Sequence, residues 1–393
     1  MLKELRSVLA LSWGHFVIDV YSPVIPAVLP LLIATHGWSY VVAGLLVAGF
    51  NITSSLLQPF VGWLADRRGV AVPFPVPFLI ASICIGVFGF IGSYPVLLIC
   101  ACLAAFGAAL FHPSAMAMVN RLTRTENRGR LTSIFVIGGN LGFALGPVLA
   151  GLAVGAFGLH GLLFLAIPGL LMAGLFGFLL PAEGTEPVKR TEEEAEAGGP
   201  LSLRPIAMVV GVGALRSWAI FAAVAFLPTY IHATLDVDLV TANTLVSLML
   251  VAGVVGQYVG GSLSDTYGRK EYTFLGLVAS VPPFILFLMT DGPLSYAGLL
   301  LFGFLLWSTF SVTVAMGQEV MPGRAGLASG LMLGLAVGAG GLGVIVSGVV
   351  ADAFSLDAAL ATLLVPIIAA ALLTLFVPYP WASFGRWLRS GAQ

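Results

Sequence analysis

Four ionisable side chains lie inside apolar stretches of this sequence, where such groups are rare and usually functional. His15 and Asp19 are four residues apart in SWGHFVIDVYSP, so they share one face of a helix. His112 precedes a proline in AALFHPSAM, and Arg216 lies in GVGALRSWAIF. A carboxylate and two imidazoles can exchange protons. We therefore interpret Asp19, His15 and His112 as a proton-coupling site and all four residues as substrate ligands.

Arg216 differs from the other three because a guanidinium stays charged and can hold a carboxylate or phosphonate through two parallel hydrogen bonds. It could instead pair with Asp19 for purely structural reasons, and His112 could be an ordinary helix-packing residue. Asn51 and Trp307 are softer candidates for the same substrate site, with helix packing as the alternative role of the asparagine.

The apolar stretches themselves indicate a membrane protein. The chain is 59% hydrophobic and 9% charged with a mean hydropathy of +1.04, whereas soluble domains are roughly 25% charged. Twelve stretches are near or above the ~20 residues that a membrane-spanning helix needs. They cover residues 7–33, 41–65, 74–92, 95–120, 130–157, 160–180, 205–231, 241–264, 272–290, 293–318, 326–351 and 356–378. They lack the alternation of a barrel strand, so we predict an all-α membrane protein with twelve transmembrane helices.

The basic residues give the orientation of these helices. All but one of the 17 lysines and arginines lie at the ends of the chain, or in or at the edge of every second gap between apolar stretches, and the exception is Arg216. Short loops rich in Lys and Arg stay in the cytoplasm. We expect a multi-pass protein of the cell's inner membrane with both termini cytoplasmic. The net charge of −1 and the three cysteines within helices favour no nucleic-acid partner, cofactor or metal site.

A sequence repeat divides the chain into halves. A polar stretch at 182–203 predicts a cytoplasmic linker between six-helix halves at 1–181 and 204–393. GWLADRRG and GSLSDTYGRK share the pattern G-x-x-x-D-x-x-G at matching places in the two halves. We interpret these charges as a latch that gates the cytoplasmic side, with ordinary topogenic loop charges as the alternative. The gating residues are Gly62, Asp66, Arg67, Gly69, Gly261, Asp265, Gly268, Arg269 and Lys270.

Parallel six-helix repeats joined by a long cytoplasmic loop resemble the major facilitator fold. In the fifth stretch, Gly142, Gly146, Pro147 and Gly151 match the motif G-x-x-x-G-P-x-x-x-G that marks antiporters of that superfamily. FHPSAM, VIGGNLGFALGP and the four ionisable residues resemble its fosmidomycin-resistance family. The resemblance implies that the four ionisable residues line a central cavity. One feature departs from drug–proton antiporters, because Leu103 stands where an arginine is common in the fourth span.

These observations predict a secondary active transporter. The leading hypothesis is a proton-coupled antiporter that exports a small organic, anionic or phosphonate-like compound by alternating access, as a monomer in the bilayer. A proton symporter or uniporter for an organic anion is the alternative within the same class. A nontransporting receptor or an intramembrane enzyme is a remote alternative, since the sequence shows no nucleophile–base set and no sensor domain.

Overall fold

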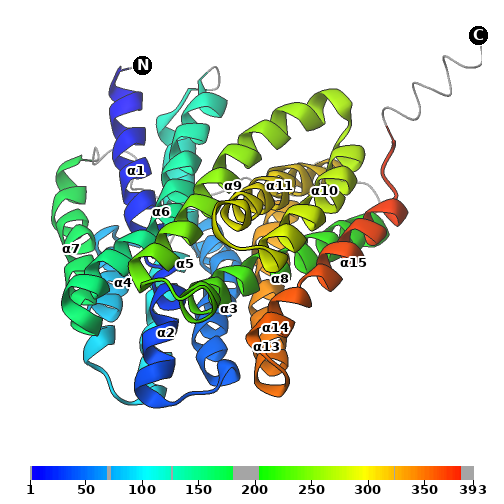
Figure 1. The fold of residues 1–393 in the computed structure, drawn as a ribbon. Helices are drawn as coiled ribbons and strands as arrows, with labels where there is room; N and C mark the ends of the chain where they lie inside the picture. The colour runs from blue at the N-terminus through cyan, green and yellow to red at the C-terminus, as the bar shows by residue number, and fades with distance from the viewer. Residues whose placement is uncertain (1, 69–71, 125–126, 180–202, 323, 382–393) are drawn as a thin grey trace, which may run out of the picture. The chain divides into compact units, whose positions relative to one another are not determined.

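The computed structural model describes residues 2–68, 72–124, 127–179, 203–322 and 324–381 of the 393, and these residues are overwhelmingly helical (Figure 1). Contacts between Cα atoms divide the chain into two compact units. Unit 1 is Met1–Thr191 with Val224–Ser247, and unit 2 is Glu192–Ala223 with Leu248–Gln393. The division passes through two helices, α8 (Leu203–Thr234) and α9 (Leu239–Tyr267). The predicted linker 182–203 lies outside the described residues except for Leu203, which begins α8.

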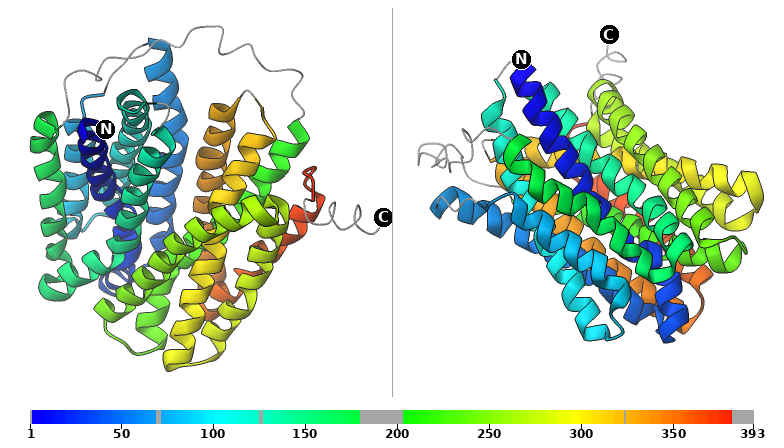
Figure 2. Two further views of the ribbon diagram at one scale, coloured as in Figure 1. Left: turned by 90° about the horizontal axis from the view of Figure 1, so that it is seen from above. Right: turned by 90° about the vertical axis from the view of Figure 1, so that its left-hand side faces the viewer.

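Unit 1 contains the helices before the predicted linker. They are α1 (Leu2–Val20), α2 (Val24–His36), α3 (Tyr40–Arg68), α4 (Pro75–Val87), α5 (Tyr94–Leu122), α6 (Arg128–Phe157) and α7 (Leu162–Leu179). Short 3-10 turns at Phe88–Phe90 and Gly158–Gly161 extend α4 and precede α7. Within the unit, α1 packs along α6, and α4 packs against α5 and α7 (Figure 2).

Unit 2 contains the remaining helices. They are α10 (Arg269–Met289), α11 (Gly292–Glu319), α12 (Ala325–Gly330), α13 (Val337–Ala353), α14 (Leu356–Ala361) and α15 (Leu364–Phe376). A π-helix at Leu331–Ala336 joins α12 to α13 without a break. Helix α10 packs against α11 and α15.

The predicted all-α membrane fold is confirmed. Ten helical stretches of the described residues are long and apolar enough to cross a membrane, and one of these, Arg128–Phe176, contains both α6 and α7. A shorter apolar helix at Pro75–Phe90 accounts for the remaining predicted stretch. The first predicted stretch is two helices, because a turn at Tyr21–Pro23 separates α1 from α2. Pro23 has no backbone N–H to continue the helical hydrogen bonding across that turn.

Candidate functional site

Three of the predicted site residues meet within unit 1. Asp19 on α1 is bracketed by two imidazoles, His15 one helical turn earlier and His112 on α5. The Nε2 atom of His112 lies 2.9 Å from Asp19 Oδ1, and that of His15 lies 3.2 Å from Asp19 Oδ2. Each carboxylate oxygen therefore has its own imidazole. We call these three side chains the His–Asp–His cluster; its ligand atoms lie within 4.8 Å of one another, a spacing that one small cation could also occupy.

Backbone carbonyls hold the far side of both rings. His15 Nδ1 lies 2.9 Å from the Phe135 carbonyl oxygen on α6, and His112 Nδ1 lies 2.8 Å from that of Ala108 on its own helix. The Phe135 ring also stacks on the His15 ring at 4.3 Å between centroids. These contacts fix the ring orientations, so that each Nε2 atom points at the carboxylate.

Glycines of α6 let that helix approach α1 directly beside the cluster. A Cβ atom at Gly139 would lie 2.3 Å from His15 Nε2 and 2.6 Å from Asp19 Oδ2. At Gly142 it would lie 2.1 Å from the Phe16 carbonyl oxygen. No ordinary side chain fits at such distances, so glycine at both positions allows the contact between the two helices. Gly139 was not among the predicted residues, although the glycine pair that precedes the predicted motif is visible in the sequence.

The other members of the predicted glycine motif also pack closely within unit 1. A Cβ at Gly146 would meet Pro23 Cγ at 2.4 Å, and one at Gly151 would meet Asn243 Cβ at 2.9 Å. Pro147 lies inside α6, and the next residue, Val148, donates its backbone N–H to Ser247 at 2.9 Å. The motif thus has a packing role in this fold; its meaning for antiport is a separate prediction.

Arg216 is buried within the seventh predicted span, and its partners come from α11. Its Nη1 atom donates to Thr313 Oγ1 at 2.5 Å and to the Thr309 carbonyl oxygen at 3.2 Å. The Phe310 ring covers the guanidinium at 4.6 Å from the ring centroid. The Nε and Nη2 atoms are buried and have no hydrogen-bond partner among the described residues. Thr313 and Phe310 were not predicted, since nothing in their local sequence marks them.

The two softer candidates differ in their surroundings. Trp307 lies on α11 with its ring 6.2 Å from that of Phe310, the residue whose ring covers Arg216. Asn51 is buried on α3, and its Nδ2 atom has no hydrogen-bond partner in the part of the chain that the structure describes. No contact of Asn51 with the His–Asp–His cluster is observed among these residues.

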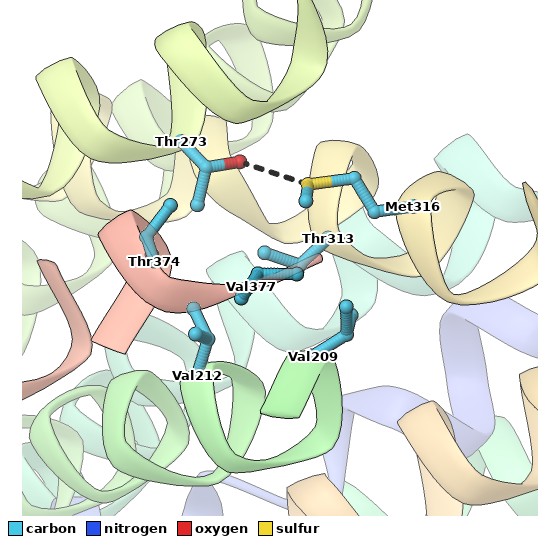
Figure 3. Close-up of a pocket in the computed structure, with 7 residues that line it drawn as sticks. All are labelled: Val209, Val212, Thr273, Thr313, Met316, Thr374 and Val377. Atoms are coloured by element: carbon cyan, nitrogen blue, oxygen red, sulfur yellow. Dashed lines mark hydrogen bonds between the residues drawn. The ribbon is translucent and has the colours of Figure 1, made fainter. Parts of the chain in front are cut away.

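A small pocket in unit 2 adjoins the Arg216 contacts (Figure 3). Its lining residues come from α8, α10, α11, α15 and the residue after α15. They are Val209, Val212, Thr273, Thr313, Met316, Thr374 and Val377. Thr313 therefore touches Arg216 and the pocket, while the Thr273 hydroxyl approaches Met316 Sδ at 3.6 Å. The lining has no ionisable side chain, so this pocket is not the predicted anion site.

The second copy of the predicted gating motif forms an ion-pair network. Arg269 lies 3.0 Å from Asp265 and 2.6 Å from Glu319, joining the end of α9 to the end of α11. Tyr379, beyond α15, donates its hydroxyl to Glu319. Burial, together with this bond beside a carboxylate, raises the pKa of Tyr379 to about 12. Lys270 donates to the Val377 carbonyl oxygen at 2.8 Å.

The glycines of the motif have different roles. Gly268 has a φ of +108°, which favours glycine at the junction of α9 and α10. A Cβ at Gly62 or Gly261 would find its nearest neighbour at an ordinary 3.7 Å, so neither position needs glycine for close helix approach. In the first copy of the motif, Asp66 and Arg67 lie in the last turn of α3, and their side chains are outside the described structure. Gly69 lies outside the described residues.

Comparison with known proteins identifies the family. The family model of the Major Facilitator Superfamily matches residues 11–343. The chain belongs to the major facilitator superfamily. Its neighbours of known structure agree on the fold: a bacterial homologue of the human lysosomal transporter Spinster, in an inward-facing state, superposes with a TM-score of 0.76. That likeness covers 94% of both chains at 16% sequence identity.

Two curated relatives cover most of the chain. The fosmidomycin resistance protein of Escherichia coli K12 is 28% identical over 355 residues, which are 88% of this chain and 87% of the relative. The uncharacterized MFS-type transporter YfnC of Bacillus subtilis 168 is 30% identical over 356 residues, 87% of this chain and 85% of the relative. The predicted resemblance is confirmed. This chain is a multi-pass membrane transporter for a small molecule, and its family and structural neighbours are transporters rather than enzymes.

Proposed function

We propose that this transporter is a proton-coupled antiporter that exports a small organic compound from the cell. It would act as a monomer in the inner membrane, with both termini in the cytoplasm. The His–Asp–His cluster would exchange protons while the six-helix halves predicted from the sequence rock around a central site. The gating residues around Asp265 would hold the cytoplasmic side closed in one state and release it in the other.

The four contacts between ring nitrogens and oxygen atoms in the cluster are the observation that carries this proposal. Each ring nitrogen of His15 and His112 faces an oxygen, two belonging to backbone carbonyls and two to the Asp19 carboxylate. A neutral imidazole has one N–H, and an ionised carboxylate has none. Two neutral rings and a carboxylate therefore supply two hydrogens for four contacts. Two further protons would give each of the four contacts one hydrogen, whichever of the facing atoms carry them.

Loss of these protons gives the cluster a reason to rearrange. Without them, two of the four contacts place a nitrogen lone pair against an oxygen atom, at a carbonyl or at the carboxylate according to the tautomer, which is repulsive. Helices α5, α6 and α7 pack against α1, and from α5 His112 joins His15 in contacting the Asp19 carboxylate. Proton binding would thus favour one arrangement of α1 and α5 over another, and substrate would bias the same equilibrium.

Two observations support export rather than import. The glycine motif of α6 matches the superfamily's antiporter motif, and the Escherichia coli relative is named for resistance to a drug. Symport or uniport of an organic anion is the alternative. A symporter would use the same cluster to carry protons, and a uniporter would not need it. The direction in which a pH gradient drives substrate separates these possibilities.

The test is transport into proteoliposomes with the membrane potential clamped at zero and fosmidomycin as the first labelled probe. An acidic lumen should drive accumulation. If two protons exchange per substrate, one pH unit supports an accumulation of about 100-fold, against about 10-fold for one proton. His112→Gln should lower the exponent from two to one. Asp19→Asn should abolish accumulation but retain exchange between substrate pools.

Three results would contradict the proposal. Accumulation driven by an alkaline lumen would show symport, and equilibration that is insensitive to pH would show uniport. Gradient-driven accumulation that survives in Asp19→Asn would remove this carboxylate from the proton path. Gln58→Leu is a matched control, because it removes a polar group of α3 whose amide bonds Ser54 on the same helix at 3.0 Å.

A further inference from the structure

We propose that the substrate carries an oxyanion, a carboxylate, phosphonate or sulfonate, and that Arg216 binds it through the Nε–Nη2 edge of its guanidinium. This names the substrate class of the proposed exporter and rests on that function. The sequence indicated only that an arginine at this place could bind an anion. The contacts now show which edge of the group is available.

One side of the guanidinium is already occupied. The two hydrogens on Nη1 match two acceptors, the Thr313 hydroxyl oxygen and the Thr309 carbonyl oxygen. The Thr313 hydroxyl is itself anchored, since it donates within α11 to the Thr309 or Phe310 carbonyl oxygen at 3.0 or 2.9 Å. This side therefore has no donor left for a ligand.

The Phe310 ring lies over the guanidinium, so the orientation of the group is fixed by contacts at an end and on a face. What remains is the edge formed by Nε and Nη2, whose N–H groups point in parallel and match the two oxygens of a carboxylate, phosphonate or sulfonate. Both atoms are buried and lack a hydrogen-bond partner among the described residues.

A buried cationic edge without an acceptor is unfavourable, and it would become favourable on binding an oxyanion. A neutral amide or alcohol offers at most one good acceptor to this edge and does not neutralise its charge. Phe310 places aromatic surface next to the group and Trp307 lies next to Phe310, an arrangement that suits an anion with an organic body better than an inorganic one.

Thr313 is then a positioning residue. It does not contact the ligand in this scheme, but it holds Nη1 so that the other edge stays directed at the site. Its loss should weaken anion binding less than loss of the guanidinium, and serine, which keeps the hydroxyl, should restore the affinity.

The experiment measures ligand-induced thermal stabilisation of the purified full-length protein in detergent, without any proton gradient. The probes are benzoate, phenylphosphonate and benzenesulfonate, with benzamide as the neutral counterpart of benzoate. At least one anion should stabilise the wild type at millimolar concentration, and benzamide should not. Arg216→Lys should weaken that binding about 10- to 100-fold, the loss expected for one charge-assisted hydrogen bond.

Matched variants keep the result interpretable. Thr313→Val should weaken binding several-fold and Thr313→Ser should not, whereas Ser308→Ala removes a buried α11 hydroxyl that bonds the Leu305 carbonyl oxygen on the same helix and should have no effect. Equal stabilisation by benzamide, no response to any anion, or an unchanged affinity in Arg216→Lys would overturn the inference.

A structural role for Arg216 predicts a different pattern. If Arg216→Gln misfolds and the added change Asp19→Asn restores folding with wild-type anion affinity, the arginine serves only as a partner of that carboxylate. The outcome is separable from that of the proton-coupling test. Anion binding in detergent needs no proton exchange, and a uniporter of organic anions would pass this test and fail the transport test.

Discussion

Gly139→Ala should weaken the coupling of transport to the proton gradient while leaving the helices in place. The added Cβ would lie 2.3 Å from His15 Nε2, 2.4 Å from His15 Cε1 and 2.6 Å from Asp19 Oδ2. Ordinary van der Waals contact begins near 3.4 Å, so the imidazole must move by about 1 Å. His15 is held on its other side by the Phe135 carbonyl oxygen at 2.9 Å, which leaves little room for that movement.

The magnitude follows from this overlap. Overpacking by one methyl group costs typically 1–3 kcal/mol, and here the strain falls on side-chain atoms of the cluster rather than on the backbone. A shift of about 1 Å would lengthen the 3.2 Å contact between His15 and Asp19 beyond hydrogen-bonding distance. One of the two further protons would then lose the Asp19 oxygen that accepts its hydrogen bond.

The assay is the same proteoliposome accumulation at clamped potential, with exchange between substrate pools as the measure of intact protein. We expect accumulation to fall about tenfold per pH unit of gradient, as for loss of one exchangeable proton, while exchange persists. Gly129→Ala on the same helix is the matched control, because a Cβ there meets nothing within 4 Å. Full proton-driven accumulation in Gly139→Ala would refute the argument that this glycine holds the cluster in its working geometry.

Three further predictions concern other parts of the molecule. Gly142→Ala should reduce the amount of folded protein, because its Cβ would lie 2.1 Å from the Phe16 carbonyl oxygen and backbone cannot rotate away; normal yield and melting temperature would contradict this. Asp265→Asn should slow transport far more than it weakens substrate binding, measured as turnover against Kd, since it breaks the 3.0 Å contact with Arg269; equal losses would argue against gating. Asp238 caps α9, and hydrogen bonds from Thr241 lower its pKa. Its stabilisation is therefore present above the pKa of the unfolded carboxyl group and is lost as pH falls through the folded value. Asp238→Ala should lower the melting temperature at pH 7 but not at acidic pH, and a deficit that does not depend on pH would count against the ionised cap.

Much of the helical architecture could be predicted from the sequence. Whether a segment can span the membrane is a local property, because about 20 consecutive apolar residues suffice and distant residues play no part. The predicted stretches fall on helices for that reason. The break at Tyr21–Pro23 was missed, since hydropathy measures apolarity and Tyr21 to Pro23 lie in a continuous apolar stretch.

The candidate site was predictable only in part. The pairing of His15 with Asp19 follows from their helical spacing, and the sequence also marked His112 and Arg216 as ionisable groups within spans. Three features could not be predicted from the sequence. They are the carbonyls that hold the two rings, the contact at Gly139, and the support of Arg216 by Thr313 and Phe310.

The sequence by itself determined which groups this protein places in its membrane spans, because each charge there stands out against an apolar background. Tertiary structure alone decided which of those groups meet and through which atoms. His112 and Asp19 are 93 residues apart in the chain, and Arg216 and Thr313 are 97 apart. Their contacts depend on how each helix is rotated about its axis, which the packing of neighbouring helices sets and no local sequence pattern encodes.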